Sequence, residues 1–278
     1  MLTIQTALLQ GTEILDKAAI PVARLTAEVL LAHAMGRDRV YLYAHSDQEL
    51  REVDWIHYGR YLHERSQGKP TQYITKRQEF YGREFRVTSD VLIPRPETEH
   101  VAEAAIELAR IHSAQSILDI GTGSGALAVT LALETRAPVV AATDLSPAAA
   151  AIAKKNASSL NAAVSFAVCD LASAIADHSV DLIVSNPPYV PLSQRHSLQR
   201  EVRDWEPELA LFGGERGFDL YERIILDAPR VLRPGGWLVL ELGFGCEPHV
   251  SSLLSHWREV RIQPDLAGIP RVAIARTA

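Results

Sequence analysis

The first 75 residues carry apolar side chains at the three- and four-residue spacing of amphipathic helices. Short polar links, marked by Pro21 and Gly36, separate these periodic stretches and predict a small helical bundle. We expect residues 1–75 to form a substrate-docking domain, and a plain accessory domain is the alternative. The pattern predicts helices over about 2–19, 24–35, 38–44 and 47–66.

The pattern then changes to two runs of aromatic and β-branched residues within 78–93, on either side of Tyr81-Gly82-Arg83. Such runs around a turn are typical of a β-hairpin. A Pro-Arg-Pro sequence at 94–96 interrupts the chain, and a helix with acidic residues in its first turn follows. We therefore expect a hairpin linker over 76–94.

From residue 116 onward, apolar strands alternate with helices. This alternation predicts a mostly parallel sheet with helices on both faces, and therefore an α/β domain over 95–278. No helix separates the last two strands, which indicates one antiparallel edge. The expected strands cover 116–120, 138–144, 164–170, 180–186, 237–243, 259–265 and 271–278, and the expected helices 97–110, 126–134, 147–158, 218–232 and 248–256.

Composition narrows the class of protein. The chain has 278 residues, 47% of them hydrophobic, and a net charge of −6, which argues against a protein that coats nucleic acid. Only two cysteines occur, Cys169 and Cys246, and the ten histidines show no metal-ligand spacing, so we expect no disulfide framework and no metal site. No signal peptide or long apolar run is evident, and we expect a cytoplasmic protein without membrane contact.

A glycine-rich turn follows the first strand of the alternating region. The run SILDI leads into Gly121-Thr122-Gly123-Ser124-Gly125. In doubly wound folds this turn lies at the carboxyl edge of the sheet, where ligands bind, and its glycines allow the backbone to approach a ligand closely. Dehydrogenases, methyltransferases and some ligand-free folds all contain such a turn, so the turn alone does not name the ligand.

Three acidic residues at successive strand ends identify the expected ligand more closely. Asp119 directly precedes the turn, where a carboxylate disfavours a pyrophosphate and suits the amino group or sulfonium of S-adenosylmethionine. Asp144 ends the second strand and can accept from both ribose hydroxyls, while Asp170 ends the third and can accept from an adenine amino group. The alternative is a set of solvated loop acids or helix caps. We expect a cofactor site.

The fourth strand ends in Asn186-Pro187-Pro188-Tyr189, the strongest chemical signal in the chain. A conjugated –NH2 group is a poor nucleophile because its lone pair is delocalised. The Asn186 oxygen and the Pro187 carbonyl, aimed by the proline ring, can accept from its two N–H bonds, and Tyr189 can lie against its flat face. The lone pair then points at the sulfonium methyl. The motif predicts methylation of a planar amino group, and a rigid proline turn is the alternative.

At these residues the sequence resembles the HemK/PrmC family, the peptide chain release factor glutamine N5-methyltransferases. The resemblance covers nearly the whole chain, and IPRPETE and the N-terminal helical region are its most specific parts. It is carried by GKPTQYI (68–74), EFYGREFRV (79–87), VLIPRPETE (91–99), LDIGTGSGALA (118–128), SNPPYV (185–190), EPELALFGG (206–214) and LRPGGWLVLELGFG (232–245).

The resemblance implies a Rossmann-like class I methyltransferase fold with a seven-stranded sheet, preceded by a five-helix domain and a hairpin linker. It implies S-adenosylmethionine as the cofactor, with S-adenosylhomocysteine as the product. The implied substrate is the glutamine of the Gly-Gly-Gln motif in class 1 release factors. The family is typically monomeric, so the resemblance also implies a monomer.

The resemblance also assigns roles by position in this sequence. The cofactor is expected at the glycine-rich turn, Asp144 and Asn186, with Leu171 at the adenine beside Asp170. The glutamine amide is expected at Asn186, Pro187, Pro188 and Tyr189, and the wall of the active site at Arg95, Pro96 and Glu97.

Other functions share parts of these patterns. An adenine N6-methyltransferase uses the same amino-group chemistry, but it needs a target-recognition region and phosphate contacts. A ribosomal-protein glutamine methyltransferase shares every catalytic residue and differs only in its docking surface. An intact motif argues against a non-catalytic binding protein, and a dehydrogenase lacks an evident hydride-handling His or Lys. We expect a release factor as the protein substrate and no stable nucleic acid binding.

Overall fold

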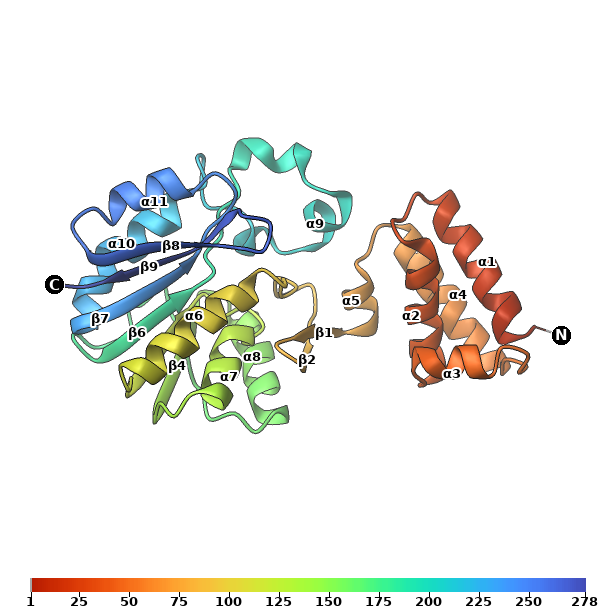
Figure 1. Ribbon diagram of the computed structural model, residues 1–278. Helices are drawn as coiled ribbons and strands as arrows, with labels where there is room; N and C mark the ends of the chain where they lie inside the picture. Colours follow the sequence, from red (N-terminus) through yellow and green to blue (C-terminus); the bar gives the residue numbers. More distant parts are fainter. Residues whose placement is uncertain (1) are drawn as a thin grey trace. The chain divides into compact units, whose positions relative to one another are not determined.

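The computed structural model describes residues 2–278, which form two compact units (Figure 1). One unit contains the N-terminal helices through Arg77 together with Gln199–Trp205, and the other contains Gln78–Leu198 and Glu206–Ala278. The inclusion of the short segment in the helical unit was not expected from the sequence, which assigned residues 95–278 to the α/β domain. No helix in the described part of the chain is long and apolar enough to cross a membrane.

The helical unit has the five N-terminal helices that the family resemblance implied. Its core is formed by aliphatic side chains around the buried ring of Tyr58. The fifth helix is a single turn whose periodicity is too short to detect in the sequence. The helices are α1 (Ile4–Lys17), α2 (Ala23–Met35), α3 (Arg39–Ala44), α4 (Glu52–Ser66) and α5 (Thr71–Thr75).

The added segment of this unit is the short helix α9 (Arg200–Trp205). The Arg65 guanidinium, on α4, donates to the Glu201 carboxylate at 2.6 Å, and only 7% of the Arg65 side chain is exposed. The Lys69 ammonium lies 5.7 Å from the centre of the Trp205 ring. An ion pair and a cation–π contact therefore attach α9 to the N-terminal helices.

The expected hairpin is present as β1 (Arg77–Phe80) and β2 (Arg83–Arg86). Its aromatic residues Phe80 and Phe85 meet edge to face and are buried in the core of the larger unit. The Asn156 side chain accepts from the Arg86 amide and donates to its carbonyl, which ties the hairpin to helix α8 (Pro147–Ser159).

The larger unit is built on a seven-stranded sheet in the order β5-β4-β3-β6-β7-β9-β8 (Figure 1). The first five strands in this order are parallel, whereas β9 runs antiparallel to both of its neighbours, so the expected antiparallel edge is confirmed. The strands are β3 (Ser116–Ile120), β4 (Val139–Asp144), β5 (Ser165–Val168), β6 (Val180–Ser185), β7 (Leu232–Glu241), β8 (Arg258–Pro264) and β9 (Pro270–Arg276).

Alternate residues of each strand pack into two separate cores, one on each face of the sheet. Ile117, Trp237 and Val239 pack with α6 (Thr98–Ile111) and α7 (Ala126–Glu134). Leu118 and Leu238 pack on the other face with α10 (Asp219–Val231) and α11 (Glu247–Leu253). Helix α8 (Pro147–Ser159) packs against β4 and β5. The period of two along the strands confirms a doubly covered sheet.

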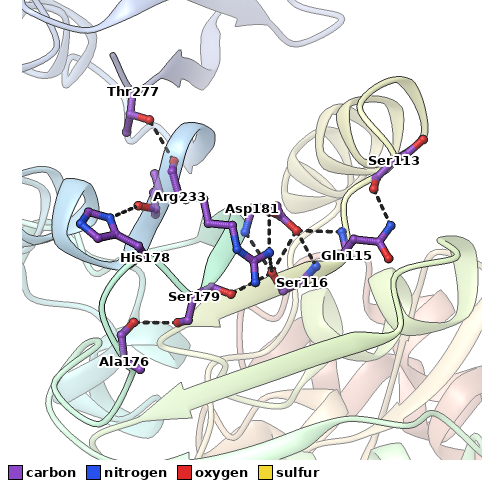
Figure 2. Close-up of polar contacts among 10 residues, drawn as sticks. Ser113, Gln115, Ser116, Ala176, His178, Ser179, Asp181, Arg233 and Thr277 are labelled. Carbon is purple, nitrogen blue, oxygen red and sulfur yellow. Dashed lines mark hydrogen bonds and ion pairs between the residues drawn. The ribbon is translucent and has the colours of Figure 1, made fainter.

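Asp181 joins the starting ends of three neighbouring strands (Figure 2). Its Oδ2 accepts from the backbone amides of Gln115 and Ser116 at 2.8 and 2.9 Å, and its Oδ1 accepts from the Arg233 guanidinium at 2.7 Å. Partial burial opposes ionisation, but these donors outweigh it and lower the pKa of Asp181. This network lies at the opposite edge of the sheet from the strand ends that carry the predicted site.

We expect Asp181→Ala to lower the free energy of unfolding by about 1–2 kcal/mol, because three donors lose a charged acceptor. The matched control is Asp177→Ala, which removes an exposed ion pair with Arg230 and should cost less than about 0.5 kcal/mol. Urea unfolding measures both variants. Equal losses in the two variants would contradict the role of Asp181.

The difference in the free energy of unfolding between wild type and Asp181→Ala depends on pH. The folded-state pKa of Asp181 lies below its ordinary value of 3.8. The stabilisation is therefore present at neutral pH and is lost as the pH falls through the lowered pKa. The difference between wild type and Asp181→Ala should shrink below about pH 4.

Candidate functional site

A cavity of about 450 Å³ opens at the carboxyl ends of β3, β4 and β6. This volume is within the range of about 300–1,000 Å³ that is typical of small-molecule sites. The three strands are adjacent and parallel, which brings their separate end segments to one edge of the sheet. The predicted residues in the lining are Asp119, Gly121, Thr122, Gly123, Ser124, Asp144, Asp170, Leu171, Asn186, Pro187 and Pro188.

The glycine-rich turn combines open space with one close contact. Gly121, Gly123 and Gly125 have φ values of +73°, +56° and +83°, which side chains rarely adopt. A Cβ on Gly121 or Gly123 would meet no atom within 4 Å, whereas one on Gly125 would lie 3.0 Å from the Ala153 Cβ. The first two glycines therefore present bare backbone to the cavity, and the third allows α7 to approach α8.

Asp119 is buried beneath this turn, with 1% of its surface exposed. Its Oδ2 accepts from the Thr122 hydroxyl at 2.6 Å and from the Ala128 amide at 3.2 Å, so it holds the turn and the start of α7 together. Its Oδ1 is buried and has no hydrogen-bond partner among the described residues. Burial raises the pKa of Asp119 to about 7, against the lowering effect of these donors. This oxygen is therefore an acceptor that the protein itself does not occupy among the described residues.

Asp144 lies at the end of β4 and also shapes the turn. Its Oδ2 accepts from the Gly123 amide and its Oδ1 from the Ser146 amide, both at 2.8 Å. A carboxylate oxygen has two acceptor positions, so each oxygen retains capacity for one more donor. The half-buried carboxylate lines the cavity, where it can accept from ribose hydroxyls as the sequence predicted.

Asp170 and Leu171 also line the cavity but differ in character. The Asp170 carboxylate is half exposed and accepts from the Arg223 guanidinium at 2.6 Å. Leu171 adopts a left-handed conformation with φ +48° and packs against the core beneath it. Leu171 can therefore supply an apolar surface to a ring, while Asp170 would share its acceptors between Arg223 and a ligand.

The loop after β6 is held by glycines that come from distant segments. A Cβ on Gly213 would lie 2.4 Å from the Pro188 carbonyl oxygen, and one on Gly243 would lie 2.4 Å from Cδ2 of the Tyr189 ring. Val190 donates its backbone amide to the Leu211 carbonyl at 2.9 Å. The loop therefore depends on EPELALFGG and LELGFG, which carried the family resemblance without an assigned role.

Asn186 is linked to a buried acid that sequence reasoning missed. Its Nδ2 donates to the Thr98 hydroxyl at 3.1 Å, and that hydroxyl donates to Glu241 Oε2 at 2.5 Å. Thr98 begins α6 and lines the cavity, and Glu241 is the last residue of β7. The sequence does contain a signal for this acid, since a single Glu lies within the apolar run WLVLELG. An acid that is buried in a strand needs a hydrogen-bond donor from another segment.

Arg95, Pro96 and Glu97, which are expected to form a wall of the active site, directly precede α6. Arg95 donates to the Glu206 carboxylate at 2.5 Å, and the Glu206 side chain is 1% exposed. Glu97 occupies the N-cap position of α6 without a side-chain capping bond. Among the described residues, the segment 89–92 and Thr98 line the cavity, whereas Arg95, Pro96 and Glu97 do not belong to the lining. Their expected contact with a substrate stays a prediction.

Comparisons with known proteins agree with this geometry. Residues 6–75 match the PrmC N-terminal domain, and residues 102–202 match the methyltransferase small domain. A release factor glutamine methyltransferase of Koribacter versatilis is 44% identical over 99% of both chains. Another, from Geobacter sulfurreducens, is 42% identical over 87% of this chain and 84% of the relative.

The fold also resembles a solved methyltransferase. This is the T. thermophilus 16S rRNA N2 G1207 methyltransferase, whose structure is in complex with AdoMet and guanosine. The TM-score is 0.51 at 19% identity, covering 73% of this chain and 50% of that chain. At this identity the similarity establishes the fold alone.

We expect Gly243→Ala to reduce the rate of methyl transfer about 10- to 100-fold, because the added Cβ must displace the Tyr189 ring. Binding of S-adenosylmethionine should be retained. The matched control is Gly59→Ala, where an added Cβ meets no atom within 4 Å. Steady-state kinetics and calorimetry test both variants. A wild-type rate for Gly243→Ala would contradict the packing role.

Proposed function

Because the chain belongs to the release factor glutamine methyltransferase family, we propose that it methylates the side-chain amide nitrogen (N5) of a glutamine in a release factor. The methyl donor is S-adenosylmethionine, and the target is the Gly-Gly-Gln motif of class 1 factors. One observation carries this proposal: Asn186, Pro187 and Pro188 line the same cavity as the glycine-rich turn. We propose the cytoplasm as the site of the reaction, because the proposed substrate is a translation protein.

The residues of the cavity fit S-adenosylmethionine. Gly121 and Gly123 leave space beside the backbone, and the unpaired Oδ1 of Asp119 offers an acceptor for a cationic group. Asp144 offers acceptors for the ribose hydroxyls, and Leu171 offers an apolar surface for the adenine ring. When bound, this ligand supplies an electrophilic methyl carbon on a sulfonium.

Asn186 and Pro187 are suited to orient a planar amide. Both lie at the cavity wall where β6 ends, and Asn186 already uses its Nδ2 on Thr98, which leaves its Oδ1 as an acceptor. The Asn186 oxygen and the Pro187 carbonyl accept from the two N–H bonds of the glutamine. The Tyr189 ring packs on Gly243 and does not belong to the cavity lining among the described residues. We propose that it contacts the amide from the loop after β6.

The bond changes in the transfer balance without a strong base. The new N–C bond forms as the S–C bond breaks, the sulfonium becomes a neutral thioether, and the amide nitrogen gives one proton to solvent. Orientation of the amide is the contribution of the protein. Loss of an orienting acceptor should therefore lower the rate and spare the cofactor.

The experiment that tests this proposal mixes the protein with labelled S-adenosylmethionine and a class 1 release factor. A matched reaction contains the factor with its Gly-Gly-Gln glutamine replaced by alanine. We expect label on the native factor alone. Label on both factors would contradict the proposed target. Absence of label with cofactor binding intact would favour a ribosomal protein or a nucleic acid substrate.

In the same assay we expect Asn186→Ala to lower the rate by at least about 100-fold, because one acceptor of the amide is lost. Calorimetric affinity for S-adenosylmethionine should remain close to that of wild type, since Asn186 is expected to orient the substrate. A near-normal rate would contradict the assigned role of Asn186.

Two acidic residues of the cofactor site should differ in their effect on affinity. Asp144→Ala removes acceptors for Gly123, Ser146 and the ribose and should weaken S-adenosylmethionine binding about 10- to 100-fold. Asp170→Ala removes a half-exposed acceptor that Arg223 already shares and should weaken binding less than about threefold. Calorimetry measures both, and the reverse order would contradict these assignments.

A further inference from the structure

Glu241 is a buried acid outside the cofactor site, and the expected amide chemistry does not use it directly. Only 1% of its surface is exposed. It occupies the same face of β7 as Trp237 and Val239, whose side chains pack with α6. A buried carboxylate needs a donor, and the Thr98 hydroxyl at the start of α6 is that donor at 2.5 Å.

The direction of the hydrogen bonds follows from the single proton of the hydroxyl. Thr98 donates this proton to Glu241 Oε2, so the Thr98 oxygen can only accept a hydrogen bond from a third group. That group is Asn186 Nδ2, at 3.1 Å. The Asn186 amide is therefore anchored through its NH2 group, and its Oδ1 is the atom left for a ligand.

We propose that Thr98 and Glu241 are positioning residues, which fix the Asn186 amide so that its oxygen faces the substrate glutamine. The inference rests on the proposed glutamine methylation and extends it to two residues that act on the substrate through Asn186. Glu241 orients Thr98, and Thr98 orients Asn186. Neither group needs to contact the reacting atoms.

Protonation of Glu241 would reverse the orientation of the Asn186 amide. A protonated Glu241 donates to the Thr98 oxygen, which frees the Thr98 proton for the Asn186 oxygen. The Asn186 amide then turns over and presents its NH2 group to the NH2 group of the glutamine. Two donors facing each other cannot form a hydrogen bond. Ionised Glu241 is therefore the productive form.

The surroundings of Glu241 place this change near neutral pH. Burial raises the pKa of Glu241 to about 7, against the lowering effect of the Thr98 hydrogen bond. Its folded-state pKa lies above the ordinary value, so the productive ionised form increases as the pH rises through about 7. The charged and titratable groups that face Glu241 are Arg271 from β9, Arg95 and Glu97 from the segment before α6, Tyr189 from the loop after β6, and Tyr221 from α10.

The first test compares Thr98→Val with Thr98→Ser. Valine keeps the shape but removes the hydroxyl, and we expect kcat to fall about 10- to 100-fold with little change in affinity for S-adenosylmethionine. Serine restores the hydroxyl and should restore most of the rate. The matched control is Thr130→Val, since the buried Thr130 hydroxyl has no hydrogen-bond partner among the described residues. A wild-type kcat for Thr98→Val, or an equal loss in Thr98→Ser, would overturn the proposal.

The second test uses the pH profile of Glu241→Gln. The glutamine oxygen can still accept from Thr98, so substantial activity should remain at pH 8. The variant has no ionisation at this position, so the rise of kcat with pH around 7 should be absent. The profile is measured at saturating S-adenosylmethionine, because Asp119 in the proposed cofactor site also has a pKa of about 7. A variant profile that keeps the wild-type rise would overturn the role of Glu241.

A third measurement separates failure of this inference from failure of the proposed function. The side-chain amide of Asn186 is followed by 15N NMR across pH 5–9, and its signal is assigned by its loss in Asn186→Ala. We expect a shift with a midpoint near pH 7 in wild type and none in Glu241→Gln. If wild type does not label the release factor, the proposed function fails, and the NMR titration still decides whether Glu241 controls Asn186. No midpoint in wild type overturns the inference whatever the methylation result.

Discussion

A carboxylate can be buried only where donors replace its hydration, and this requirement determines the geometry of the site. Asp119 and Glu241 belong to β3 and β7, the strands on either side of β6. The donors to Asp119 come from the glycine-rich turn and the start of α7, so pairing this acid shapes the side of the cavity proposed for the cofactor. The donor to Glu241 is Thr98, which reaches the loop after β6. The positions of the glycine-rich turn and of the loop after β6 therefore both depend on the hydrogen bonds of a buried acid.

The sequence predicts those parts of the molecule that depend on local pattern. Alternation of strands and helices predicts the covered parallel sheet, and the glycines of the turn predict a backbone that a ligand can approach closely. The positive φ values at Gly121, Gly123 and Gly125 agree with such a turn. The strand ends predict that Asp144 and Asn186 meet at one cavity, because parallel strands bring their carboxyl ends to one edge.

The other features of the site depend on contacts between segments that are distant in the chain. Asn186 and Thr98 are 88 positions apart, and no local periodicity connects them. Gly243 has a role only because the Tyr189 ring packs on it. Glu241 could be suspected as an acid in an apolar strand, but its partner depends on which helix covers that face. Such contacts become visible only when the packing is known.

The chain passes between its two compact units three times, at residues 77–78, 198–199 and 205–206. The helical unit is therefore discontinuous in the gene, although its first 77 codons look like a separate module. An N-terminal truncation removes Arg65 and Lys69 but leaves behind Glu201 and Trp205, with which they pair. In a chimera that exchanges only the N-terminal codons between two relatives, the two residues of each contact come from different proteins. These two stretches of sequence are therefore expected to be inherited, and to diverge, as one unit.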